Sequence, residues 1–198
     1  MTPMTQMKQL VTQSRSVRRF HQDHKIETET LMELADLARL SPSAANLQPL
    51  RYVLSCDPAM NEKIFDCLGW AAYLKDWPGP VEGERPAAYI VIMGDSKIAN
   101  DYISYDCGIA AQTILLAANQ KGLGGCMLGS VNRKKLAAIL DAPADLPLFL
   151  VIALGKPGEE VQTEPLGPDG NIRYWRDENG VHHVPKRSLE DVVIQSYP

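Results

Sequence analysis

The stretch SPSAANLQP, residues 41–49, is the most informative part of this 198-residue chain. It directly follows residues 28–40, where leucine and alanine recur at helical spacing, and its first proline ends the helix predicted there. Between the two prolines, Ser43, Asn46 and Gln48 offer hydrogen-bond donors and acceptors. These groups match the polar edge of a planar heterocycle, although an ordinary turn after a helix has the same composition.

Strands and helices are mixed along the rest of the chain. The expected strands are residues 50–55, 87–93, 123–128 and 148–154, and the expected helices are residues 4–13, 28–40, 58–68, 101–121 and 132–140. The expected helix caps are Thr28, Asp57, Gly122 and Asn132. Because neither a linker nor an internal repeat is visible, the pattern predicts a single domain, residues 1–198, with an α/β or α+β layer fold.

Three segments leave more than one interpretation open. The second half of the helix at 101–121 is apolar on nearly every side, which is typical of a helix buried centrally or in a subunit interface. The loop at 69–86 either lines a pocket for a planar substrate or covers the core or a neighbouring subunit. Its relevant side chains are Trp70, Tyr73, Leu74 and Trp77. Residues 159–168 are expected to be extended and a hairpin is expected around 177–180, with no role assigned.

Composition and charge exclude several classes of function. The formal net charge is −4, so the chain as a whole is not attracted to nucleic acid or to an anionic membrane. No apolar run is long enough to cross a bilayer. Four cysteines without a Cys-x-x-Cys pair, and no apolar signal segment in residues 1–13, favour a reducing cytoplasm. The histidines lack the converging partners that zinc requires, so we expect no metal site.

Two basic segments stand near opposite ends of the chain. The first is Arg-Ser-Val-Arg-Arg at residues 15–19, and the second contains Lys186 and Arg187. Arginine, lysine and a serine hydroxyl are suitable partners for a phosphate monoester, although isolated basic pairs are most often solvated surface charges. Together with the turn at 41–49, the two segments predict a binding site for flavin mononucleotide (FMN).

A glycine-rich segment, Gly-Leu-Gly-Gly at residues 122–125, follows the long helix. It does not complete a dinucleotide fingerprint, because Met127 stands where a third glycine is required. Glycine lets the main chain approach a flat ligand, so the backbone N–H groups of Gly129 and Ser130 are candidates to face N5 and O4 of a flavin. Close packing of a buried strand explains the same glycines.

In this order, the segments resemble the nitroreductase family of FMN-dependent oxidoreductases over nearly the whole chain. The marks are Arg-Ser-x-Arg at residues 15–18, Pro-Ser-x-x-Asn-x-Gln-Pro at 42–49, the long alanine-rich helix before Gly-Leu-Gly-Gly, Gly-Lys-Pro at 155–157 and Lys-Arg-Ser-Leu-Glu at 186–190. Ser14 and Gly129 differ from many members, which carry a basic residue and an acidic or bulky residue at these positions.

The resemblance implies an α+β fold with a central, mostly antiparallel sheet flanked by helices. It also implies a homodimer in which the long helix is buried at the interface and each FMN touches both subunits. The residues that match the family's FMN contacts are Arg15, Ser16, Arg18, Pro42, Ser43, Asn46, Gln48, Leu128, Gly129, Ser130, Lys186 and Arg187.

The implied reaction is hydride transfer from NADH or NADPH to flavin N5 and then to a small acceptor, such as a nitroaromatic or a quinone, in ping-pong order. Because the flavin carries the chemistry, no catalytic side chain is assigned. One alternative keeps the fold with another flavin reaction, such as reductive dehalogenation or flavin breakdown. The other alternative is a flavin-binding module without catalysis.

Overall fold

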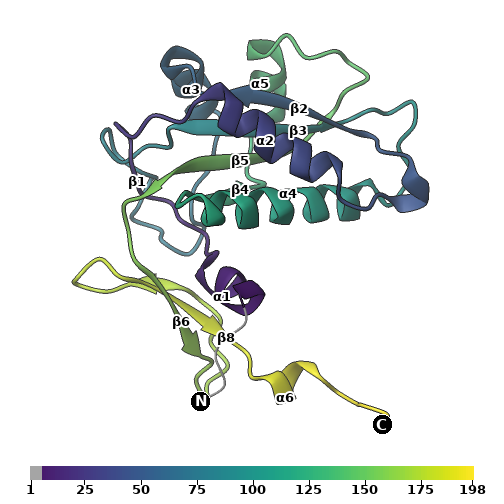
Figure 1. The fold of residues 1–198 in the computed structure, drawn as a ribbon. Helices are drawn as coiled ribbons and strands as arrows, with labels where there is room; N and C mark the ends of the chain where they lie inside the picture. Colours follow the sequence, from purple (N-terminus) through teal and green to yellow (C-terminus); the bar gives the residue numbers. More distant parts are fainter. Residues whose placement is uncertain (1–5) are drawn as a thin grey trace.

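A computed structural model of the protein describes residues 6–198. Its centre is a five-stranded sheet whose strands pair only in antiparallel fashion (Figure 1). In chain order, the strands are β1 (Phe20–His21), β2 (Leu50–Ser55), β3 (Ala88–Gly94), β4 (Gly124–Leu128) and β5 (Leu148–Pro157). β5 lies between β3 and β4, and β2 follows beyond β3. The predicted α+β class, with an antiparallel sheet, is confirmed.

The sheet is buried on both faces because its central strands are apolar at nearly every position. Alternate side chains of β3 enter two separate cores, as the twofold repeat of a strand requires. One set is Ala88, Ile90 and Ile92, and the other is Tyr89, Val91 and Met93. Full burial of one such aliphatic side chain contributes about 1.5–3 kcal/mol to stability, so the side chains of both cores stabilise the sheet in this position.

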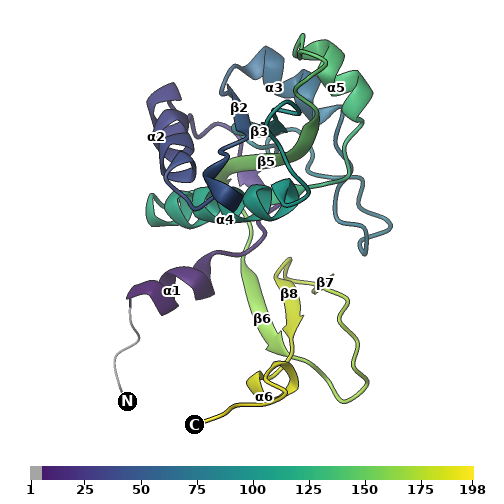
Figure 2. The ribbon, with the colours of Figure 1, turned by 90° about the vertical axis from the view of Figure 1, so that its right-hand side faces the viewer.

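Helices cover both faces of this sheet (Figure 2). The first core lies under α2 (Thr28–Arg39) and α4 (Ile103–Gln120), and the second lies under α3 (Pro58–Phe65) and α5 (Arg133–Ile139). The caps predicted for α3 and α5 are confirmed: the side chain of Asp57 accepts from the N–H of Met60, and that of Asn132 accepts from the N–H of Lys135. Gly122 follows α4 with φ +74°, as expected for a helix end.

One side of α4 is exposed in the single chain. Ala110, Ala111 and Ile114 are buried against the sheet. On the opposite side, Tyr105 is 68% and Ile109 is 41% exposed. The chain by itself therefore leaves part of the apolar surface of this helix uncovered.

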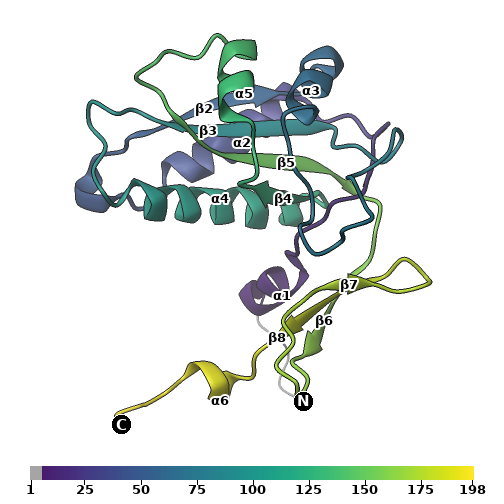
Figure 3. The same ribbon diagram turned by 180° about the vertical axis from the view of Figure 1, so that it is seen from behind.

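A second, smaller sheet follows β5 and lies beside α1 (Gln6–Gln13), below the main body in the view of Figure 1. Its strands are β6 (Val161–Pro165), β7 (Trp175–Arg176) and β8 (His182–Lys186). β6 pairs with β8 in parallel, and β7 pairs with β8 across the predicted hairpin turn. The short α6 (Leu189–Val192) comes next, and the chain after it extends away from the body (Figure 3).

Some predicted boundaries were wrong. The N-cap of α2 is Glu27 rather than Thr28, whose hydroxyl lies 3.2 Å from the Cys56 thiol. α3 ends at residue 65 instead of 68, because Leu68 pairs with Val131 in a short β-bridge. The first residues of the helix predicted at 4–13, residues 4 and 5, lie outside the described part of the chain.

The predicted end of the strand at residue 154 was also wrong. β5 continues through Gly155 and Lys156 to Pro157, because β1 pairs with its last two residues. An added Cβ at Gly155 would lie 2.7 Å from the Phe20 ring, so the glycine permits this close pairing. β5, which the sequence predicted to end at residue 154, therefore joins the main sheet to the second one.

Candidate cofactor site

The first basic segment is extended and lies along β4. Ser16 pairs in parallel with Gly125, and the N–H of Val17 donates to the carbonyl of Gly125 at 3.0 Å. The Val17 side chain is buried, while Ser16 is exposed and Arg18 is half-buried. The pairing with β4 therefore fixes which side chains of the segment enter the core and which face outward.

The second sheet brings the two basic segments together. Parallel pairing of β6 with β8 places Lys186 opposite Pro165. Lys186, Arg187 and Arg15 line a single cavity of about 540 Å³ between α1 and the second sheet. Residues about 170 positions apart in the sequence thus surround one space, which their three cations line together with the carboxylates of Glu164 and Asp191.

These cations are poorly paired within the chain. Nε of Arg15 and Nε of Arg18 are buried and have no hydrogen-bond acceptor. Between residues 6 and 198, neither Lys186 nor Arg187 forms an ion pair. A buried donor without an acceptor is costly, and an anionic oxygen is the partner that would relieve it. The residues therefore fit a phosphate group.

The turn at 42–48 is held in an unusual backbone conformation by Asp106 of α4. The buried Asp106 carboxylate accepts from the Ser43 hydroxyl at 2.7 Å and from the N–H of Ala44 at 2.9 Å. The Ser43 oxygen in turn accepts from the N–H of Gln48 at 3.0 Å. This chain of bonds offsets the strain of the positive φ angles at Ala45, Asn46 and Gln48, which are 51°, 55° and 52°.

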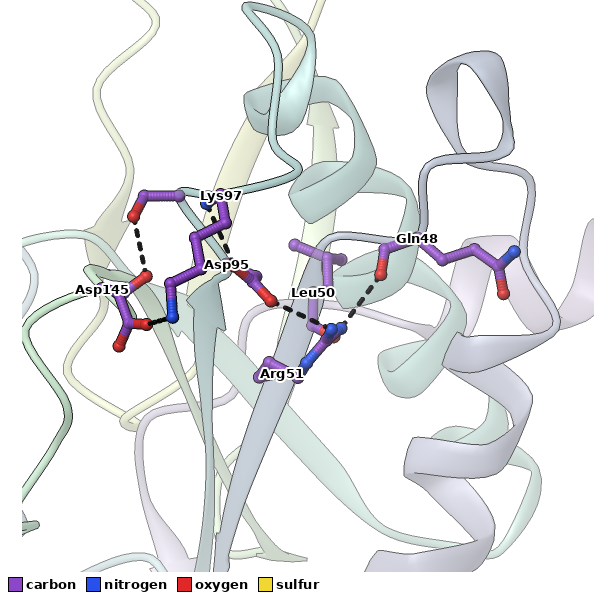
Figure 4. Close-up of polar contacts among 7 residues, drawn as sticks. Gln48, Leu50, Arg51, Asp95, Lys97 and Asp145 are labelled. Atoms are coloured by element: carbon purple, nitrogen blue, oxygen red, sulfur yellow. Dashed lines mark hydrogen bonds and ion pairs between the residues drawn. The ribbon is translucent and has the colours of Figure 1, made fainter.

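The far end of the turn is held from β2 (Figure 4). Nη1 of Arg51 donates to the Gln48 carbonyl at 3.0 Å and to the Leu50 carbonyl at 2.9 Å, while Nη2 lies 3.2 Å from Asp95 Oδ2. Next to this group, Lys97 forms an ion pair with Asp145. Because both ends of the turn are fixed, the exposed Asn46 and Gln48 side chains project from a defined base.

The turn and the basic segments lie at opposite ends of α4. Pro42, Ser43 and Gln48 line a cavity of about 510 Å³ that Asp106 also lines. Arg15 lines a smaller cavity of about 120 Å³ together with Asn119, in the last turn of α4. Thirteen residues of helix separate Asp106 from Asn119, which corresponds to roughly 20 Å. A single chain therefore does not bring the three predicted segments to one place.

The glycines of β4 divide between the two interpretations left open by the sequence. An added Cβ at Gly125 would lie 2.3 Å from the Ala153 carbonyl oxygen, and one at Gly124 would lie 2.9 Å from the Pro157 ring. These two glycines are required for close packing. At Gly129, by contrast, an added Cβ would meet nothing within 4 Å. Open space above the main chain is thus found at the end of β4, where a flat ligand is predicted.

The residues at this end of β4 also fix the start of the loop at 69–86. Leu128 is buried, whereas Gly129 and Ser130 are exposed. The Ser130 carbonyl accepts from the N–H of Gly69 at 2.8 Å. The loop that is one candidate for substrate binding therefore begins directly beside the segment that is a candidate for contact with the flavin ring.

The aromatic residues of this loop pack mainly on the protein. Trp70 is buried, with its ring 5.6 Å from that of Phe65 and 6.5 Å from that of Trp77. Tyr73 is 45% exposed and packs on Tyr174 at 5.0 Å. Within residues 6–198, Trp70, Tyr73, Leu74 and Trp77 line neither the three cavities described above nor a further cavity of about 550 Å³ beside α3. In the single chain, these side chains cover the core and the second sheet.

Two carboxylates that matter for this arrangement were not assigned to the site from the sequence. The sequence signal for Asp106 was an acid in a largely apolar helix. Nothing in the sequence distinguished Glu159 from the neighbouring Glu160, which is an ordinary exposed acid. The Glu159 carboxylate accepts from the N–H groups of Arg18 and Arg19 and from the Arg176 guanidinium.

Within the described chain, no group of three or more His, Cys, Asp or Glu side chains is arranged to hold a metal ion.

Burial raises the pKa of the Cys126 thiol to about 12 and that of Cys107 to about 11, so both stay protonated near neutral pH. No helix between residues 6 and 198 has the length and apolar character needed to cross a bilayer.

Comparison with known proteins places this chain in a family. The sequence model of the Nitroreductase family matches residues 11–156. A protein of Methanothermobacter thermautotrophicus is 31% identical over 169 residues, which are 81% of this chain and 83% of that protein; its name proposes an NADH dehydrogenase or NAD(P)H nitroreductase. The chain belongs to the Nitroreductase family, so the resemblance inferred from its motifs is confirmed.

Solved structures show the same fold. A protein of Desulfovibrio desulfuricans, described as a proposed nitroreductase in complex with FMN, matches with a TM-score of 0.69 and 22% identity. The match covers 99% of this chain and all of that one. An oxidised iodotyrosine deiodinase bound to FMN and 3-iodo-L-tyrosine matches with a TM-score of 0.64 and 20% identity, over 86% of this chain and 94% of that one.

Proposed function

We propose that the chain is an FMN-dependent oxidoreductase that uses NADH or NADPH to reduce a small acceptor, such as a quinone or a nitroaromatic. The observation that carries the proposal is the meeting of Arg15, Lys186 and Arg187 around one cavity in a member of the Nitroreductase family. Cations and a hydroxyl in the lining suit a cofactor that brings its own chemistry. The two carboxylates in the lining have partners within the chain: Glu164 contacts His183, and Asp191 accepts from the N–H of Ser188.

The protein's part is to bind and orient. FMN, when bound, supplies the hydride transfer, so that the nicotinamide donor and the acceptor bind in turn. Arg15, Arg18, Lys186 and Arg187 offset the charge of the phosphate, and the unpaired Nε groups gain acceptors. The open main chain at Gly129 leaves room for a planar ring.

The complete site requires a second subunit. Because about 20 Å of α4 separates the turn at 42–48 from the basic segments, the carboxamides of Asn46 and Gln48 reach the ring only from a neighbouring copy. The exposed side of α4, with Tyr105 and Ile109, is the surface for that contact. A twofold axis across α4 would place each turn beside the partner's basic segment, and it would create two equal sites.

The absorption spectrum of the purified protein tests this function. We expect a yellow protein with flavin bands, which NADH or NADPH bleaches without oxygen and an added quinone restores. A panel of quinone, nitroaromatic and haloaromatic acceptors then identifies the substrate class. A colourless protein that takes up no added FMN in calorimetry would refute the proposal.

Substitution of the basic pair tests the anchor separately. Lys186→Ala with Arg187→Ala should weaken FMN binding roughly ten- to a hundredfold, because a charge-assisted hydrogen bond contributes about 1.5–3 kcal/mol. The control is Lys134→Ala, an exposed lysine on α5. Equal FMN affinity in the two variants would remove the pair from the site.

A further inference from the structure

The residues after β5 carry a buried carboxylate that contacts the first basic segment. The Glu159 side chain is only 2% exposed. Its Oε1 accepts from the N–H of Arg18 at 2.6 Å and from the N–H of Arg19 at 3.1 Å, while Oε2 accepts from Nη2 of Arg176 at 2.7 Å. A buried carboxylate is tolerated only with such compensation, and this one is compensated almost entirely by the segment at 15–19 and by the second sheet.

The two backbone contacts fix the local conformation of the basic segment. In an extended strand, successive N–H groups point toward opposite edges. The N–H groups of Arg18 and Arg19 converge on one oxygen, so the backbone bends at this point around the anion. The carbonyl of Arg19 accepts from the N–H of Gly158 at 2.8 Å, which completes the contact. The direction in which the Arg18 side chain leaves the backbone therefore depends on Glu159.

The second sheet also contacts the arginine side chains. The Arg18 guanidinium lies over the Tyr174 ring at 5.2 Å, and that of Arg176 lies over the Trp77 ring at 4.8 Å. These contacts use the flat faces of the guanidinium groups. At the edges, Nη2 of Arg176 donates to Glu159 and Nη1 of Arg18 lies 3.4 Å from the Ser16 carbonyl oxygen. Nε of Arg18 has no acceptor. The Arg18 guanidinium is thus oriented by its surroundings while its Nε–H still lacks an acceptor that a ligand could supply.

We infer that Glu159 is a positioning residue for FMN, and that the segment at 158–184 serves to build the phosphate anchor. The same small sheet supplies Lys186 at one end and, through Glu159 and Arg176, holds Arg18 at the other. This inference rests on the proposed function. It assigns a role to a segment for which the sequence offered none.

The test compares three full-length variants by titrating the apo-protein with FMN and following flavin fluorescence. Glu159→Ala removes both acceptor oxygens and should raise the Kd for FMN roughly tenfold. Glu159→Gln keeps one carbonyl oxygen for the N–H groups and should give a smaller rise. Glu160→Ala, the matched control on the exposed neighbour, should leave the Kd unchanged.

A second control separates positioning from loss of stability. Leu136→Ala empties a fully buried site on α5, in the core on the other side of the sheet, and should lower the unfolding midpoint without changing the Kd. If Glu159→Ala binds FMN as tightly as the wild type, or if Leu136→Ala weakens binding as much as Glu159→Ala does, the inference is wrong.

Amide hydrogen exchange in the apo-protein keeps this result independent of the proposed function. Loss of the carboxylate should speed exchange at the N–H groups of Arg18 and Arg19, and Glu160→Ala should not. Failure of the wild type to bind FMN would refute the function and leave the exchange result to judge Glu159. Unchanged exchange at both amides, in a protein that binds FMN, would refute only the positioning role.

Discussion

At the scale of single residues, Asp106 shows how an acid in a largely apolar helix stabilises a neighbouring turn. Its carboxylate receives two hydrogen bonds from the turn and leads through Ser43 to Gln48. Left-handed backbone at a residue other than glycine costs of the order of 1 kcal/mol, and Ala45 has no side-chain group to compensate for it. The bonds to Asp106 supply this compensation from outside the turn.

We predict that Asp106→Asn destabilises the protein by about 2 kcal/mol, since the two donors bond different carboxylate oxygens, an amide has only one oxygen, and the charge assistance is lost. The urea midpoint of unfolding measures this effect. Asp101→Asn, at an exposed acid just before α4, is the control and should unfold as the wild type does. Equal midpoints for the two variants would show that the turn keeps its conformation without the carboxylate.

At the scale of elements, β4 and the residue directly after it carry two kinds of glycine with different physical demands. Gly125 packs against the Ala153 carbonyl and also pairs with Ser16, so it joins the sheet to the basic segment. Gly129 borders open space. The sequence shows both as the same letter, and only the neighbours distinguish them.

These two positions give different expectations for the same substitution. Gly125→Ala should lower the free energy of unfolding by roughly 1–3 kcal/mol, because backbone atoms 2.3 Å from the new Cβ must move. Gly129→Ala should leave both the unfolding midpoint and FMN binding unchanged, because the added methyl group meets nothing within 4 Å and the predicted flavin contact uses the main-chain N–H. Denaturant titration of the apo-proteins measures stability, and flavin fluorescence measures FMN binding. A stable Gly125→Ala protein would contradict the packing role.

Local patterns predicted most elements, because the apolar residues that face the core recur at a regular spacing within each element's own sequence. β2 matches its predicted range, and the period of apolar residues located both α2 and α4. The extension of β5 to Pro157 was missed because it depends on β1, which lies more than a hundred residues earlier. Glu159 was missed for the same reason: its partners at Arg18 and Arg19 are distant in sequence.

At the scale of the whole molecule, the single chain leaves much apolar surface uncovered. Tyr105 and Ile109 are exposed on α4, and Ile194 and Tyr197 are 98% and 83% exposed beyond α6. Apolar surface of this extent is typical of contacts between subunits. The proposed site is divided between the two ends of α4, which also indicates a dimer. A second copy would bring its turn at 42–48 beside the basic segments of the first.

Mixing two inactive variants tests whether the site is shared between subunits. One variant carries Lys186→Ala and Arg187→Ala and keeps its turn; the other carries Ser43→Ala and Asn46→Ala and keeps its basic pair. Each homodimer should bind FMN weakly. After unfolding and refolding together, half of the dimers are mixed and each contains one intact site, so roughly a quarter of all sites should recover. Recovery of flavin fluorescence quenching measures this fraction. If each chain built its own site, every site in the mixture would keep one defective half, and no mixing ratio would restore binding.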